Sequence, residues 1–180
     1  MSKLKWMFAQ VVLLAAIGLA MPAGAADAPA AASVRPLVGG VWISGQISPD
    51  QIEELKAQGI KAIVDLRPDG EAPEQPPSSA VDAAARSAGL AFSYAPVAGS
   101  DIPAAAVDAV SRAIARPDNA VLLYCKSGRR AARTWALAEA SRFGGLEAEA
   151  IEAVVTSAGQ SVDDLKEQIA ARVATRPKLP

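Results

Sequence analysis

Short apolar runs alternate along this chain with longer stretches in which apolar residues recur every three or four positions. The short runs fall at residues 41–46, 60–67, 90–97 and 120–124, and a stretch with helical periodicity follows each of them. The last run, AVLLY, is apolar throughout, which is typical of a strand buried on both faces. This order predicts a single α/β domain with a mainly parallel central sheet and flanking helices.

Capping residues and prolines refine the limits of the helices. Ser48 and Pro49 predict a helix start, and Ser100 or Asp101 is expected to cap the helix that contains Pro103 in its first turn. A proline-rich stretch directly follows the second strand and predicts a long loop at residues 68–79. The remaining helical patterns lie at residues 80–89, 128–143, 146–159 and 162–175.

The first 26 residues have the pattern of a secretory signal peptide. Lys3 and Lys5 precede an apolar run at residues 11–20, and Ala-Gly-Ala at residues 23–25 suits cleavage. We therefore expect export to the periplasm and no stable membrane association after cleavage. The predicted order is a signal peptide (1–26), an Ala/Pro-rich lead-in (27–36), the domain itself (37–145) and a C-terminal helical extension (146–180).

Composition narrows the chemistry. Removing Lys3 and Lys5 from the 18 basic residues leaves 16 against 19 acidic ones, a formal net charge of −3 that argues against nucleic-acid binding. The absence of histidine argues against a metal centre and against Ser-His-Asp catalysis, and we expect no cofactor. The single cysteine, Cys125, has no partner for an internal disulfide and is either an inert buried residue or a reactive thiol.

The loop after the last strand supplies what a reactive thiolate requires. Gly128 can turn backbone N–H groups toward the sulfur, Ser127 can donate a hydrogen bond, and the following helix begins with its positive dipole end. Arg130 can hold an anion with two parallel hydrogen bonds. Lys126 and Arg129 are weaker candidates for substrate binding, because Arg129, like Arg133, is as readily explained as solvated helix surface.

In a parallel sheet, ligands bind beyond the carboxyl ends of the strands. The loops that follow Arg67 and Val97 should therefore meet Cys125 at one edge of the sheet.

Three separated motifs resemble the beta-lactamase-hydrolase-like phosphatase-like domain family, which is also labelled a sulfur transferase family. The resemblance covers residues 37–143 and implies a fold similar to the dual-specificity cysteine phosphatases. The family signatures correspond to Gln46 with Pro49, to Arg67 with Glu71, and to residues 125–130. The resemblance implies substrate-binding roles for Gln46, Arg67 and Glu71, and the chain departs from it in having Lys126 where arginine is usual.

The spacing of the loop distinguishes two reactions. Cysteine phosphatases of this fold place their clamping arginine six positions after the nucleophile, where this chain has Ala131, whereas Arg130 stands at the fifth position, as in rhodanese-like loops. This favours sulfur transfer through a Cys125 persulfide, from thiosulfate or another persulfide donor. Hydrolysis of a phosphoester through Cys125 is the alternative, and a non-catalytic anion-binding module is the third hypothesis. A thiol reductant is expected as a further partner.

A phosphatase would also need a proton donor for its leaving group. Asp101 is the first candidate, and its alternative role is that of a helix cap; Asp69 and Glu71 are others. Arg67 has the alternative role of a buried partner of Glu71 or Asp65. The aromatic residues expected in the core rather than at the substrate are Trp42, Tyr94 and Trp135.

Overall fold

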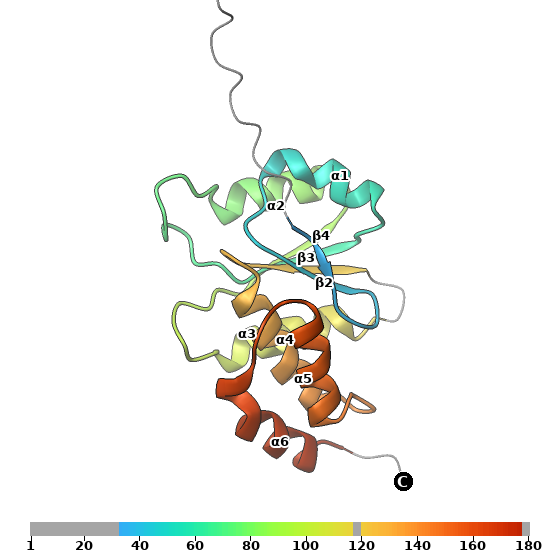
Figure 1. The fold of residues 1–180 in the computed structure, drawn as a ribbon. Coiled ribbons are helices and arrows are strands. Elements are labelled where there is room, and N and C mark those ends of the chain that lie inside the picture. The colour runs from blue at the N-terminus through green and yellow to red at the C-terminus, as the bar shows by residue number, and fades with distance from the viewer. Residues whose placement is uncertain (1–32, 117–119, 178–180) are drawn as a thin grey trace, which may run out of the picture. The chain divides into compact units, whose positions relative to one another are not determined.

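A five-stranded sheet forms the centre of the computed structural model, which describes residues 33–116 and 120–177 (Figure 1). Its order is β1-β2-β5-β3-β4, with β2, β5, β3 and β4 parallel and the short β1 antiparallel to β2. The strands are β1 (Arg35–Pro36), β2 (Val41–Ser44), β3 (Ala62–Asp65), β4 (Ala91–Tyr94) and β5 (Val121–Tyr124). The predicted single α/β domain with a mainly parallel sheet is confirmed. The predicted signal peptide lies outside the described residues.

Six α-helices in the described part of the chain connect and cover the strands. They are α1 (Ile52–Ala57), α2 (Ser78–Ser87), α3 (Ala104–Ile114), α4 (Arg129–Ser141), α5 (Ala148–Ser157) and α6 (Lys166–Thr175), with 3₁₀ turns at Pro49–Gln51 and Asp163–Leu165. The expected cap of α3 was wrong. Pro103 itself occupies the N-cap position in an extended conformation, so that neither Ser100 nor Asp101 caps the helix.

The alternation of side chains in β5 divides the core into two layers. Leu123 and Cys125 face the layer built by α3, α4, α5 and α6, whereas Leu122 and Tyr124 face the layer built by α1 and α2. Figure 1 shows these two groups of helices on opposite sides of the sheet. All four residues of β5 are buried, as expected for a strand with a parallel neighbour on each side.

The two C-terminal helices pack in the same core as α4. Ile151 of α5 and Ile169 of α6 are both fully buried there. The buried carboxylate of Glu139 holds the connection between α4 and α5, because it accepts hydrogen bonds from the Arg142 side chain and from the backbone N–H of Leu146. No helix within the described ranges is long and apolar enough to cross a membrane.

The register brings the carboxyl ends of the parallel strands level. Tyr124 at the end of β5 pairs with Ser44 on one side and with Asp65 on the other, and Asp65 pairs with Tyr94. The loops after all four strands therefore leave the sheet at one edge, as expected.

The aromatic residues divide according to their position in the sheet. Trp135 is fully buried and Trp42 is half-buried against the α1–α2 layer, so both belong to the core as predicted. The expectation for Tyr94 was wrong, because it is 43% exposed at the end of the edge strand β4, where its hydroxyl accepts the N–H of Asp69.

Candidate active site

Cys125 lies directly after β5, at the N-terminus of α4. Its thiol is buried, with 1% of the residue exposed, and its Sγ accepts a hydrogen bond from the N–H of Gly128 at 3.2 Å. Gly128 is the N-cap of α4 and has φ +89°, a conformation that other residues adopt only with strain. The helix dipole and this N–H both favour negative charge on the sulfur.

The neighbouring backbone holds the cysteine loop in place. Gly45 forms an isolated bridge with Ser127, and the Gln46 N–H donates to the Lys126 carbonyl at 3.3 Å. A Cβ at position 45 would lie 3.2 Å from that same carbonyl, which explains a small residue there. From the C-terminal part of the chain, Gln160 donates its side-chain N–H to the Ser127 carbonyl at 3.3 Å.

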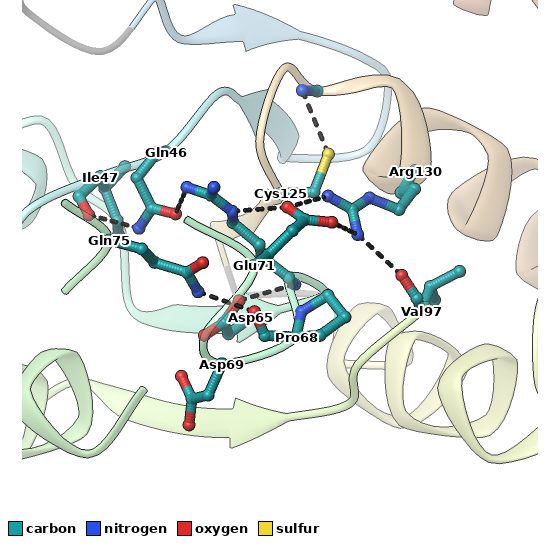
Figure 2. Close-up of polar contacts among 12 residues, drawn as sticks. Gln46, Ile47, Asp65, Pro68, Asp69, Glu71, Gln75, Val97, Cys125 and Arg130 are labelled. Atoms are coloured by element: carbon teal, nitrogen blue, oxygen red, sulfur yellow. Dashed lines mark hydrogen bonds and ion pairs between the residues drawn. The ribbon is translucent and has the colours of Figure 1, made fainter. Parts of the chain in front are cut away.

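Beside the cysteine, the Glu71 carboxylate joins two arginines (Figure 2). Arg130 pairs with both carboxylate oxygens, through Nη1 to Oε1 at 2.8 Å and through Nη2 to Oε2 at 2.9 Å. Arg67 donates its Nε to Oε2 at 2.7 Å and its Nη1 to the side-chain oxygen of Gln46 at 2.8 Å. Arg130 also donates Nη1 to the Val97 carbonyl at 2.8 Å. The structure thus joins residues from all three predicted motifs.

Charge reinforces this arrangement. Hydrogen bonds from Arg130, then from Arg67, lower the pKa of Glu71 to about 2 against the opposing effect of desolvation. Burial lowers the pKa of Arg130, but the Glu71 carboxylate and the Cys125 side chain raise it more. Arg130 is therefore a permanent cation shared between the carboxylate and the sulfur.

A buried carboxyl group, that of Asp65, contacts the backbone of Arg67 in this network. Asp65 is 1% exposed and accepts the N–H of Arg67 at 2.8 Å. Desolvation raises its pKa to about 6, although the Tyr124 hydroxyl and the Arg67 N–H oppose the shift. Burial, followed by the negative charge of Asp65, raises the pKa of Tyr124.

Replacing Asp65 with asparagine should change how stability depends on pH. The folded protein holds the Asp65 proton up to a pKa of about 6, against 3.8 as the ordinary value, so the wild type should lose stability as pH rises from about 4 to about 6. Asparagine does not titrate, so the variant should gain up to about 3 kcal/mol relative to the wild type across that window. Urea unfolding at pH 4 to 7 measures this, with the exposed Asp108→Asn as the control. Parallel pH profiles for wild type and Asp65→Asn would contradict it.

Of the three residues predicted as proton donors, two are engaged in other contacts and the third is exposed at a hollow. Asp69 accepts hydrogen bonds from the N–H and the hydroxyl of Ser78 and so holds the start of α2. Glu71 stays ionised between its arginines and is therefore a poor acid. Asp101 is exposed and lies at a hollow lined also by Arg133 and Asp164. None of the three is positioned as a proton donor by a described contact with Cys125.

The other predicted residues differ in exposure. Lys126, Ser127 and Arg129 are exposed at the rim of the loop, whereas Arg67 is buried and paired with Glu71, the alternative role expected for it. Of the two explanations left open for Arg133, solvated helix surface is wrong, since only 4% of the residue is exposed. The Val97 carbonyl went unrecognised because a backbone group carries no sequence signal. The spacing of Arg129 and Arg133, four residues apart on one helix face, was the available signal for Arg133.

Comparison with known proteins identifies the family to which the chain belongs. The model of the family described as "Beta-lactamase hydrolase-like protein, phosphatase-like domain" matches residues 24–142. The chain belongs to this family. A beta-lactamase hydrolase-like protein of Xylella fastidiosa (strain Temecula1 / ATCC 700964) is 47% identical over 97 residues, which cover 54% of this chain and 22% of the relative. The chain thus corresponds to less than a quarter of that relative's length.

Solved structures give the fold class independently. A phosphatase candidate from Neisseria meningitidis superimposes with a TM-score of 0.61 and 27% identity, over 73% of this chain and 92% of that one. The core catalytic domain of the PP-IP phosphatase SIW14 from S. cerevisiae has a TM-score of 0.55 and 17% identity, over 80% and 85% of the two chains. The phosphatase-like domain has the fold of the cysteine-based phosphatases. These likenesses fit the phosphatase alternative better than sulfur transfer.

Proposed function

We propose that this phosphatase-like domain hydrolyses a small phosphate monoester through a phosphocysteine at Cys125. The observation that carries the proposal is the position of the thiol, at the N-terminus of α4 with the Gly128 N–H on its sulfur and Arg130 beside it. The family and the fold favour a phosphoester as the substrate. The negative substrate would be held by Arg130 and by the N–H groups of the loop.

The reaction has two steps. The thiolate of Cys125 attacks phosphorus, the bond from phosphorus to the ester oxygen breaks, and the leaving oxygen takes the electron pair. Water then attacks the phosphocysteine, the sulfur–phosphorus bond breaks, and phosphate leaves with the thiolate restored. Glu71 keeps the Arg130 guanidinium oriented for both steps.

The carboxyl groups near the loop determine which kinds of leaving group the reaction can release. Glu71 remains ionised, and Asp69 is engaged with Ser78, so neither is suited to protonate an alkoxide. The proposed enzyme should therefore hydrolyse aryl phosphates, whose leaving groups are stable as anions, far faster than alkyl phosphates.

Sulfur transfer is the second candidate, and the length of the loop favours it. Arg130 comes five positions after Cys125, and Ala131 occupies the sixth position. In this reaction the thiolate attacks the outer sulfur of thiosulfate, the sulfur–sulfur bond breaks, and sulfite leaves with the electron pair. The Cys125 persulfide then passes its outer sulfur to an acceptor thiolate. No proton donor is needed when sulfite leaves.

One measurement on the full chain tests both reactions. Intact mass after acid quenching should show a gain of about 80 Da with 4-nitrophenyl phosphate if Cys125 is phosphorylated, or about 32 Da with thiosulfate if it becomes a persulfide. Either adduct should be lost in Cys125→Ser. Turnover of the aryl phosphate together with the heavier adduct supports phosphate hydrolysis. The lighter adduct alone overturns it in favour of sulfur transfer.

Absence of both adducts and of turnover would overturn both enzymatic proposals and favour a non-catalytic anion-binding module.

We also propose that the protein acts after export, on the pattern of residues 1–26. A shorter mature chain in the periplasmic fraction is the expected result, and a full-length cytoplasmic chain would contradict it.

A further inference from the structure

Arg133 is a buried arginine to which the proposed chemistry at Cys125 gives no role. Only 4% of it is exposed, and its Nη2 donates to the Asp164 carboxylate at 2.5 Å. Its Nε is buried without a hydrogen-bond partner in the described part of the chain. A buried charged donor without an acceptor is costly, so this nitrogen requires an explanation.

Arg133 lines a hollow next to the cysteine loop. The hollow has a volume of about 280 Å³ and is lined by Gly99, Ser100, Arg129, Arg130, Arg133 and Asp164. Three cations therefore face one carboxylate, and the space is several times that of a water molecule, about 30 Å³. Because Arg129 and Arg133 stand four residues apart, they share one face at the start of α4, where the helix dipole also favours an anion.

Arg130 connects this hollow to the reacting sulfur. Its side chain lines the hollow and also interacts with the Cys125 side chain. Asp164 also lines the hollow, and it lies in the 3₁₀ turn before α6, beyond the part of the chain that matches the family. Asp164 is 45% exposed and pairs with Arg133, so it is the internal anion with which a ligand would compete.

We propose that this hollow is a second anion subsite, and that the substrate carries two anionic groups. One group is attacked by Cys125, and the other is held by Arg129 and Arg133. The assignment as part of a substrate site rests on the proposed function, whereas anion binding in the hollow does not. The substrate class is thus a small molecule with a phosphate or carboxylate in addition to the reacting group.

Inorganic pyrophosphate and phosphate are the probes for the test, with full-length Cys125→Ser as the background protein. Calorimetry should show that pyrophosphate binds at least about tenfold more tightly than phosphate, because charge-assisted hydrogen bonds in the hollow add to those at the loop. Arg129→Gln should weaken pyrophosphate binding about fivefold or more. Asp164→Asn should strengthen it about threefold, because it removes the competing carboxylate.

The side chains of Arg129 and Asp164 are both exposed, so neither variant changes a buried residue. Arg86→Gln, on α2 in the other helix layer, is the matched control and should leave the affinity unchanged. Amide NMR signals of Ser100 and Arg129 should shift on adding pyrophosphate. A merely structural Arg133–Asp164 pair would not make Asp164→Asn bind more tightly.

Pyrophosphate affinity that stays within twofold in both variants would overturn the subsite, as would amide shifts confined to other parts of the chain. The outcome is separable from the proposed function. Loss of both mass adducts with retained hollow-dependent binding would overturn the reaction at Cys125 and leave the anion site standing.

Discussion

Replacing Cys125 with serine should lower turnover by at least about a thousandfold without unfolding the domain. The serine hydroxyl fits the same buried place and can accept the Gly128 N–H, which now donates to sulfur at 3.2 Å. A hydroxyl does not ionise in this environment, and no histidine is present to act as its base. Initial rates with 4-nitrophenyl phosphate and with thiosulfate measure the loss, and thermal unfolding checks the fold.

Ser127→Ala is the control for a general disturbance of the loop. Ser127 is exposed, and its contacts to Gly45 and Gln160 are made by its backbone, so alanine should retain the loop and most of the activity. If Cys125→Ser kept more than about a tenth of the wild-type rate, the thiolate could not be the nucleophile.

Replacing Arg130 with alanine should have the second largest effect. We expect kcat/KM to fall about 10²- to 10³-fold, as when a preorganised donor to developing charge is removed. The variant loses the paired contact with Glu71, the bond to the Val97 carbonyl and the positive charge beside the sulfur. Lysine should recover only part of the activity, since an ammonium group retains the charge but not the planar pair of donors.

The same change from arginine to alanine at an exposed position serves as the control for Arg130→Ala. Arg86 on α2 is 74% exposed and pairs with Asp82, so Arg86→Ala should leave kcat and KM unchanged. Equal losses in kcat/KM for Arg86→Ala and Arg130→Ala, or a loss of less than threefold in Arg130→Ala, would exclude Arg130 as the clamp.

Local patterns were sufficient to predict the framework of the site. The continuous apolar run that ends just before Cys125 forms β5, which is buried on both faces. Gly128 adopts the positive φ that the loop was expected to need, and α4 begins directly after it. These features depend on residues within a few positions of one another, so hydrophobic periodicity and glycine geometry predict them.

Positions whose surroundings come from distant segments were predicted less well. Arg133 is covered because the chain near Asp164 returns to it from 31 residues later. Tyr94 follows the alternation of a half-buried strand, yet β4 has a neighbour on one side only and leaves it exposed. Asp101 lies two residues before Pro103, which takes the cap position of α3 itself.

By itself, the sequence determined the order of strands and helices, the position of the thiol at a strand end, and the spacing from Cys125 to Arg130. Only the tertiary structure decided which charges meet. Glu71 joins Arg67, four residues before it, to Arg130, 59 residues after it, and Asp164 reaches Arg133 from the C-terminal helices. The physical reason is that backbone conformation follows from neighbouring residues, whereas the partner of a buried charge depends on how distant loops converge at the edge of the sheet.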